Sequence, residues 1–287
     1  MVKVYVVYGE GIGCHEEAAH AYRLAGAGIV ELIHMRELLA GKDISDGQIL
    51  NLSGGFLHGD ILGAGMCAAN EIEHAVVGDN GERLKELLLR FAQKGVIYGQ
   101  CNGFQVLVRT GLLPGIDRDY SRQTATLAPN DCGSYFVSQV MHLVEQKKNH
   151  FAFDSIDFLY LPCRHGEGKV VFYSPHGSIS AEDAEQNRAR VNAEHVLLRY
   201  VHPETREQTQ QFPYNPNGSI DAIAGLVDPT GHIFGHMAHP EAIVHPSRDP
   251  WWFHMKDELR RQGYSLRDIV EEGIALSIFR NVVEYVR

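Results

Sequence analysis

The sequence predicts an α/β protein whose doubly wound sheet is mostly parallel and carries an antiparallel portion. Over residues 1–110, short β-branched and aromatic runs alternate with amphipathic stretches, as they do in βαβ units. The right-handed crossover of such units places helices on both faces of the sheet. Residues 133–201 instead show strand-like runs separated by turn residues, a pattern that favours antiparallel pairing.

The elements of the parallel half follow from residue types and spacing. Residues 2–8 are a β-branched and aromatic run that ends in glycines, which is typical of a buried parallel strand. Residues 15–26 are rich in alanine with acidic residues in the first turn, and they predict a helix that ends at Gly26 or Gly28. The same reasoning predicts strands over 29–34, 48–52 and 96–99, and helices over 81–94 and 102–109.

The second half is expected to be antiparallel or mixed. Turn residues 228–231 join two apolar runs and predict a hairpin. The strongly polar stretch 181–195 predicts an exposed helix, and 266–286 predicts a C-terminal helix. We find no repeat, low-complexity tract or linker, so we expect a single domain over 1–287. Strands are predicted over 135–144, 158–163, 170–173, 220–227 and 232–237.

Composition argues against several classes of protein. The formal charge is −10 and the longest basic cluster is Lys147-Lys148, whereas a nucleic-acid groove needs clustered lysine and arginine. The five cysteines include no C-x-x-C pair, which favours a reducing compartment. We see no signal peptide and no apolar run of about 20 residues, so we expect a cytoplasmic protein without membrane contact. The 16 histidines are scattered without a helical H-E-x-x-H, so we expect no metal site.

The segment Gly99-Gln100-Cys101-Asn102-Gly103 is the cysteine version of the G-x-S-x-G nucleophile elbow. The strained turn between a buried strand and a helix lifts the thiol above the sheet edge, and the helix N-terminus favours the thiolate. The backbone N–H of Asn102 is expected to face a developing oxyanion. A cysteine after a strand is often only a small buried side chain. We keep that interpretation for Cys14, Cys67, Cys132 and Cys163.

A thiol nucleophile needs a base, and the base needs an orienting group. His239-Pro240-Glu241 offers both. In an extended segment, residues two apart point the same way, and Pro240 keeps its predecessor out of the helical region. We therefore expect the Glu241 carboxylate to hold the His239 imidazole at the end of the sheet.

Two other histidines have the same spacing to a glutamate. His202 precedes Pro203-Glu204, but the polar stretch after it indicates a surface residue. His165, in a glycine-rich turn, could line the site or a partner surface. As the catalytic base, we prefer His239.

Glycine turns follow two further predicted strands. Ser53-Gly54-Gly55-Phe56 comes after the third strand and is expected to supply a second oxyanion donor. The spacing Gly9-x-Gly11-x-Gly13 hints at a dinucleotide fingerprint, but Cys14 stands where its third glycine belongs. We therefore expect no nucleotide role for this loop.

These motifs together resemble the class I glutamine amidotransferases, and within them the glutaminase (PurQ) subunits of phosphoribosylformylglycinamidine synthase. The resemblance covers most of the chain in the right order. It rests on Gly54-Gly55-Phe56 with Gly59-Asp60, GQCNGFQ at 99–105, GLLPG at 111–115, HGEG at 165–168, NGSxDxIAG at 217–225 and His239-Pro240-Glu241.

The resemblance implies a flavodoxin-like fold and a reaction. Cys101 would form a γ-glutamyl thioester with L-glutamine, with His239 as general base and acid and Glu241 orienting it. The amides of Gly55, Phe56 and Asn102 would stabilise the oxyanion, and Gly54 and Gln105 belong to the same oxyanion and substrate site. Water would then release glutamate.

The resemblance also implies partners. Ammonia would pass to a PurL-like synthetase subunit, possibly together with a small PurS-like subunit, in purine biosynthesis. No cofactor is expected in this chain, because ATP and Mg²⁺ belong to the synthetase partner.

The sequence departs from the family in length and leaves other interpretations open. Extra segments lie near 116–133, 175–195 and 247–270, and alanines flank His239-Pro240-Glu241 where proline and arginine are usual. A class I amidotransferase could serve a different synthase, with the extra segments as its docking face. A stand-alone cysteine amidohydrolase and a non-catalytic subunit are the remaining alternatives.

Overall fold

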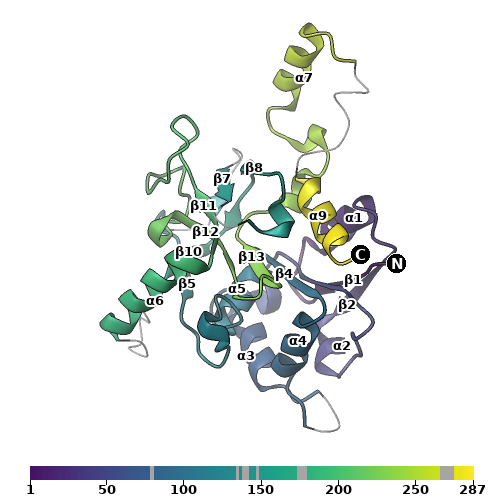
Figure 1. Ribbon diagram of the computed structural model, residues 1–287, viewed down its shortest axis with the longest axis vertical. Coiled ribbons are helices and arrows are strands. Elements are labelled where there is room, and N and C mark those ends of the chain that lie inside the picture. Colours follow the sequence, from purple (N-terminus) through teal and green to yellow (C-terminus); the bar gives the residue numbers. More distant parts are fainter. Residues whose placement is uncertain (78–80, 134–135, 138–141, 147–148, 173–179, 266–274) are drawn as a thin grey trace.

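A computed structural model describes residues 1–77, 81–133, 136–137, 142–146, 149–172, 180–265 and 275–287 (Figure 1). Within these ranges, nine strands form the main sheet in the order β2-β1-β3-β4-β13-β12-β11-β7-β8. Neighbours from β2 to β13 pair in parallel, and those from β13 to β8 pair antiparallel. The parallel strands are β1 (Lys3–Tyr8), β2 (Ile29–His34), β3 (Ile49–Leu52), β4 (Val96–Gln100) and β13 (Ile233–His236).

The antiparallel half extends the sheet away from the N-terminus. It comprises β12 (Ile223–Val227), β11 (Val196–Tyr200), β7 (His142–Gln146) and β8 (Phe158–Leu161). Two small ribbons lie beside it: β5 (Thr126–Pro129) pairs with β10 (Glu167–Val171), and β6 (Phe136–Val137) pairs with β9 (Arg164–His165). The predicted fold class, a doubly wound sheet with an antiparallel portion, is confirmed.

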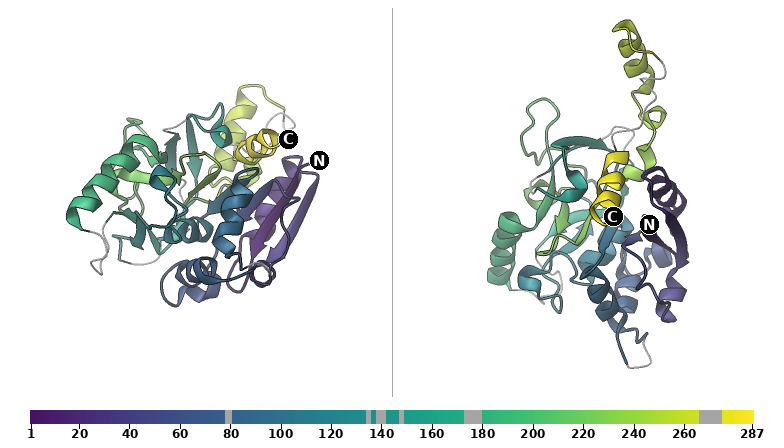
Figure 2. Two further views of the ribbon diagram at one scale, coloured as in Figure 1. Left: turned by 60° about the horizontal axis from the view of Figure 1, so that its bottom comes forward. Right: turned by 45° about the vertical axis from the view of Figure 1, so that its right-hand side comes forward.

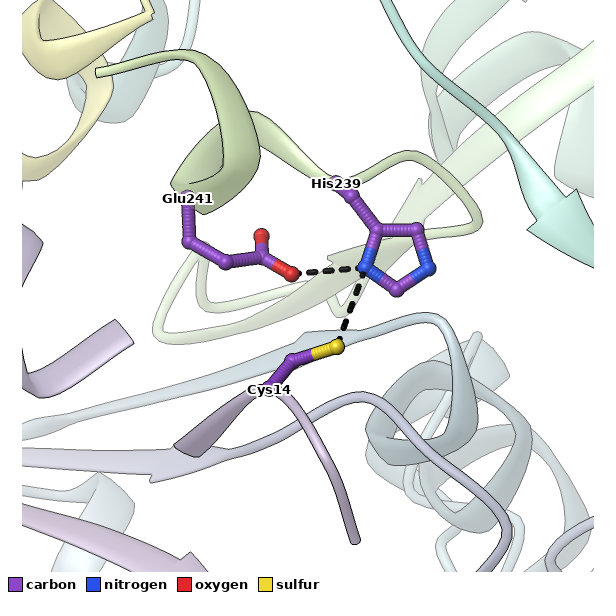
Figure 3. Close-up of side chains that lie close together, drawn as sticks. All are labelled: Cys14, His239 and Glu241. Atoms are coloured by element: carbon purple, nitrogen blue, oxygen red, sulfur yellow. Dashed lines mark hydrogen bonds and ion pairs between the residues drawn. The ribbon is translucent and has the colours of Figure 1, made fainter. Parts of the chain in front are cut away.

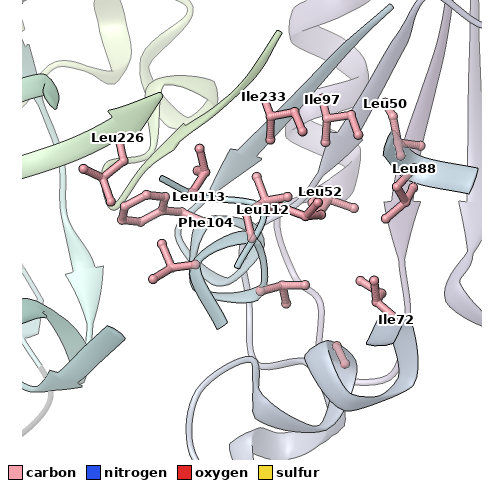
Figure 4. Packing of buried hydrophobic residues seen from close by; sticks show 14 of the residues in the cluster. Leu50, Leu52, Ile72, Leu88, Ile97, Phe104, Leu112, Leu113, Leu226 and Ile233 are labelled. Atoms are coloured by element: carbon pink, nitrogen blue, oxygen red, sulfur yellow. The ribbon is translucent and has the colours of Figure 1, made fainter. Parts of the chain in front are cut away.

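Helices cover both faces of the sheet because its strands alternate their buried side chains. Val4 and Val6 of β1 join one core cluster, while Tyr5 and Val7 join the other. The first cluster includes α1 (His15–Leu24) and α9 (Leu276–Tyr285). The second, part of which is drawn in Figure 4, packs against α2 (Met35–Leu39), α3 (Met66–His74), α4 (Leu84–Ala92) and α5 (Asn102–Arg109).

Two helices lie outside this layered arrangement. The polar helix α6 (Ala181–Glu194) has Val191 as its one buried residue, so it is mostly exposed as its composition predicts. It packs beside β11. The helix α7 (Trp252–Arg261) stands away from the body of the molecule (Figure 2). Among the described residues, no helix combines the length and apolar character that a bilayer crossing requires.

The differences from the predicted elements have local causes. The strand predicted over 135–144 is replaced by β6 and β7, with 138–141 outside the described residues. Residues 220–222 form a 3₁₀ turn before β12, because Asp221 and Ala222 have positive φ. The first part of the predicted helix 266–286 also lies outside the described residues. The helices missed were α2, α3 and α7: the first has only five residues, and α3 starts after a left-handed glycine without a capping side chain.

Candidate active site

Cys101 occupies a sharp turn between β4 and α5. Its φ of 50° and ψ of −105° lie in a region that side chains rarely adopt. The two flanking glycines make the turn possible. A Cβ on Gly99 would lie 2.7 Å from the carbonyl carbon of Gly103, and a Cβ on Gly103 would lie 2.0 Å from the Leu52 oxygen. The elbow geometry expected from the sequence is therefore present, with Cys101 only 4% exposed at the N-terminus of α5.

His239 and Glu241 reach the same sheet edge because β13 pairs in parallel with β4, with His236 beside Gln100. The Nδ1 atom of His239 lies 2.6 Å from Oε1 of Glu241, and both side chains are buried. The expected pair is formed, but not through an extended segment: Glu241 lies in a 3₁₀ turn over Pro240–Ile243. Pro240 opens that turn, which brings the carboxylate back to the imidazole.

Gly54 lies where the nucleophile and the base come together. A Cβ at this position would lie 2.7 Å from Cε1 of His239 and 3.3 Å from Cβ of Cys101. Burial alone would lower the pKa of His239, but the neighbouring Cys101 and Glu241 charges outweigh it and raise that pKa well above its usual value. The arrangement favours an imidazolium beside the Cys101 sulfur, with Glu241 on its other side.

The thiol opens onto a pocket of about 230 Å³. Predicted site residues Gly55, Phe56, Cys101 and Gln105 contribute to its lining. Five further lining residues were given no site role from the sequence: Asp60, Ala64, Arg164, Gly166 and Glu167. Three of them belong to the quoted motifs GD at 59–60 and HGEG at 165–168. His165 completes the lining.

Asn102 and Gln105 tie the elbow helix to the pocket walls. The Asn102 side chain donates to Oε1 of Gln105 at 2.8 Å and to Asp60 at 3.2 Å. The Gln105 side chain donates in turn to the backbone oxygen of Glu167 at 2.6 Å, and Arg109 contacts the Glu167 carboxylate at 2.8 Å. These bonds hold the start of β10 against α5.

The backbone amides predicted as oxyanion donors have different positions. Asn102 begins α5 directly after the nucleophile, where its N–H is one of the first-turn donors that have no acceptor within the helix. Gly55 has a φ of 146° and packs against Ile12. The Phe56 N–H donates to the Gly11 oxygen at 2.8 Å in this structure, so it would have to leave that bond to serve an oxyanion.

The two other histidines with this spacing, His202 and His165, differ in their distance from the pocket: only His165 lines it. His202 lies in a turn after β11, where its Nδ1 accepts from the Glu204 N–H at 3.2 Å, and it is not among the pocket-lining residues. His165 does line the pocket, and its ring nitrogen lies 3.2 Å from the Asn130 side chain.

Cys14 is the contact that sequence reasoning missed. Its Sγ lies 3.7 Å from Nδ1 of His239, the same nitrogen that contacts Glu241 (Figure 3). Burial raises the pKa of the Cys14 thiol, although its contact with His239 partly offsets this. The sequence signal for this contact was the glycine-rich loop that precedes Cys14. A Cβ on Gly11 would lie 1.9 Å from the Phe56 oxygen. Glycine therefore lets this loop pack backbone to backbone against the 54–56 turn.

Known proteins are similar to this chain in sequence and in fold. The sequence is 33% identical to the phosphoribosylformylglycinamidine synthase subunit PurQ of Methanococcus maripaludis, over 99% of this chain and 97% of that protein. It is 34% identical to the PurQ subunit of Dehalococcoides mccartyi, over 100% of this chain and 98% of the relative. The fold is similar to a chain in the structure of PurLQS from Thermotoga maritima, with a TM-score of 0.63, 21% identity and coverage of 100% and 99%.

The model of a protein family matches residues 1–286, nearly the whole length, and its description is "CobB/CobQ-like glutamine amidotransferase domain". The nucleophile elbow and the paired histidine and glutamate both fall inside the matched range. The chain therefore belongs to the CobB/CobQ-like glutamine amidotransferase family.

Proposed function

We propose that this chain is the glutaminase subunit of a phosphoribosylformylglycinamidine synthase, which hydrolyses L-glutamine to glutamate and ammonia. The observation that carries the proposal is the placement of Cys101 on a strained elbow, beside the buried His239–Glu241 pair and open to a pocket. The high-coverage PurQ relatives support the choice of substrate and pathway.

The geometry supports a thioester route in which protons and bonds balance. The Cys101 thiolate attacks the side-chain carbonyl carbon of glutamine, and the Asn102 and Gly55 amides face the developing oxyanion. His239 gives its proton to the leaving nitrogen, so the C–N bond breaks and ammonia departs. His239 then accepts a proton from water, which attacks the thioester and releases glutamate and the thiolate.

Glu241 serves this cycle by holding the imidazole and stabilising its charged form. Its carboxylate lies 2.6 Å from Nδ1, so the opposite nitrogen, Nε2, is the one left to exchange protons with Cys101 and the leaving group. Gln105 and Asp60 form part of the pocket wall, where we propose that the amino-acid end of glutamine binds.

Ammonia needs an acceptor, and the proposal assigns it to a PurL-like synthetase subunit that activates its substrate with ATP and Mg²⁺. The solved structure whose chain is similar in fold is that of PurLQS from Thermotoga maritima. A small PurS-like subunit would complete the complex.

Substitution of the nucleophile tests the proposal. Cys101→Ser should abolish release of glutamate from glutamine, both for the chain alone and with its synthetase, because serine lacks the acidity of the thiol. Cys67→Ala is the matched control: this half-buried cysteine lies on α3 and should leave hydrolysis unchanged. Full glutamine hydrolysis by the Cys101→Ser protein would refute the assignment.

A further inference from the structure

The second thiol at the active site completes a set of metal ligands. Cys14 Sγ, His239 Nδ1 and a Glu241 carboxylate oxygen all lie within 4.8 Å of one another (Figure 3). We propose that these three residues bind a divalent cation of borderline softness, with Zn²⁺ as the test case, and that its binding inactivates the enzyme. The inactivation rests on the proposed function, whereas the binding does not.

The ligand types and the sulfur–nitrogen spacing fit zinc. Thiolate, imidazole and carboxylate are its ordinary protein ligands. Tetrahedral bonds of about 2.3 Å to sulfur and about 2.0 Å to nitrogen place those two atoms about 3.5 Å apart, and Sγ and Nδ1 are separated by 3.7 Å. The thiol and the imidazole therefore already lie near the spacing of two ligands on one ion.

The carboxylate needs a small adjustment. Two zinc ligands of the nitrogen and oxygen type lie about 3.3 Å apart in a tetrahedral site, whereas Nδ1 and Oε1 are 2.6 Å apart. Rotation of the Glu241 carboxyl group would lengthen this distance, either by moving Oε1 away from Nδ1 or by placing Oε2 as the ligand instead. Oε2 is buried and has no hydrogen-bond partner among the described residues, so this rotation breaks no other bond there.

The backbone holds Cys14 in place for this role. Its N–H donates to the Gly54 oxygen at 3.1 Å, and Gly54 is the residue over which His239 packs. A Cβ on Gly55 would lie 2.6 Å from Cα of Ile12, so the loop that carries Cys14 cannot shift freely. Cys14 is only partly buried, and the thiol side of the site is therefore the natural entry for an ion.

Binding at these atoms would remove the base from the reaction. As the Zn–S and Zn–N bonds form, the Cys14 thiol proton and the Nδ1 proton pass to solvent. The imidazole then carries the metal on Nδ1 and keeps its hydrogen on Nε2, so it cannot accept a proton from Cys101 or from water. Glu241 would also stop orienting the ring. Removal of the ion by a chelator restores both arrangements.

Cobalt(II) is a suitable probe because thiolate ligation gives it a charge-transfer absorption, and no glutamine is required. The wild-type chain should bind one Co²⁺ with this band, and Zn²⁺ should displace it. The band should be lost in Cys14→Ala and in Cys14→Ser, which keeps the size of the side chain, with circular dichroism showing that both proteins fold. It should persist in Cys67→Ala and in Cys101→Ser.

These results distinguish an ion bound through Cys14 from one bound at the nucleophile Cys101. Persistence of the band in both Cys14 variants would overturn the proposal, and so would its loss in Cys101→Ser, which would place the ion on the nucleophile instead. Zn²⁺ should also reduce glutamine hydrolysis by at least about 100-fold, the scale of a general base, with full recovery on chelation. Unchanged hydrolysis with Zn²⁺ bound through Cys14 would overturn the inactivation. Cobalt binding is measured without catalysis, so the site and the proposed function can fail separately.

Discussion

The backbone conformation of Cys101, with φ 50° and ψ −105°, is the feature on which the chemistry depends. Such a conformation costs on the order of 1–3 kcal/mol and persists only where the surroundings enforce it. Here the surroundings are β4, α5 and the two glycines that allow them to meet. This strained turn puts the sulfur at the pocket wall, 3.5 Å from the Arg164 oxygen.

His239, rather than His202, should carry the proton transfers. His239→Ala should lower kcat for glutamine hydrolysis by a factor on the order of 10²–10⁴, the usual contribution of a general acid–base group. His202→Ala should leave kcat near the wild-type value, because its ring lies edge-on to Tyr214 in a turn after β11 and does not line the pocket. The two kcat values check this directly, and a severe loss in His202→Ala with a mild one in His239→Ala would reverse the assignment.

At the scale of elements, the site is made where β4 and β13 run side by side. Their parallel pairing puts the ends of both strands at one sheet edge, which is where open α/β sheets place their ligands. The 54–56 turn after β3 closes the same edge. Close backbone contacts therefore decide whether the site forms.

Gly103 tests this close packing. Gly103→Ala would put a methyl group 2.0 Å from the Leu52 oxygen, which should lower the free energy of unfolding by about 2 kcal/mol or more and reduce glutaminase activity. The control is Gly13→Ala, where an added Cβ meets nothing within 4 Å and the free energy of unfolding should change by less than about 0.5 kcal/mol. Urea unfolding of the two variants provides the comparison; equal stabilities would show that the elbow tolerates a side chain.

Asp221 fastens α6 to the turn before β12. Its carboxylate accepts two bonds from Arg188, each 2.8 Å, and one from Asn192 at 2.6 Å. The Arg188 bonds come first among the causes that lower the pKa of Asp221 below its usual value. A lowered pKa in the folded state stabilises the protein above the unfolded pKa, near 3.9, and this stabilisation disappears as pH falls through the folded value.

Asp221→Asn should therefore lower the free energy of unfolding at neutral pH and change it little in acid. Asparagine tolerates the positive φ of 54° at this position, so the loss should come from the charge, roughly 1–3 kcal/mol at pH 7. The difference in unfolding free energy between wild type and variant should shrink below about pH 4. A difference that stays constant from pH 7 to pH 3 would assign the effect to something other than ionised Asp221.

At the scale of the whole molecule, the sequence predicted the features that depend on residues close together in the chain. The β2 bounds 29–34, the elbow at 99–103 and the pairing of His239 with Glu241 were all predictable. Cys14 was not, because its contact with His239 joins residues 225 positions apart. No local pattern encodes the order in which strands assemble, and that order brings these residues together.

Three segments were predicted to be additions to the family length, near 116–133, 175–195 and 247–270. Residues 116–133 include β5, whose Leu127 is buried, 181–194 form α6, and 252–261 form α7 away from the body (Figure 1). Trp251, just before α7, and Phe253, on α7, are exposed. They suit contact with another protein better than support of the core, which agrees with a subunit that works in a complex.

Glutamine hydrolysis should accordingly depend on the assembly. The isolated chain should turn over slowly, and addition of the synthetase with its bound substrate should raise kcat, because closure of the site completes its catalytic geometry. A steady-state assay of glutamate release with and without the synthetase measures this. A chain that hydrolyses glutamine equally fast alone would instead support a stand-alone amidohydrolase.

The central claim is a covalent bond between Cys101 and the glutamyl group of the substrate. Acid-quenched protein taken during turnover of glutamine, digested and analysed by mass spectrometry, tests it most directly. We predict a glutamyl adduct on the peptide that contains Cys101, absent from the Cys101→Ser protein. An adduct on Cys14, or none on any peptide while glutamine is being hydrolysed and thioesters are shown to survive the quench, would contradict the account.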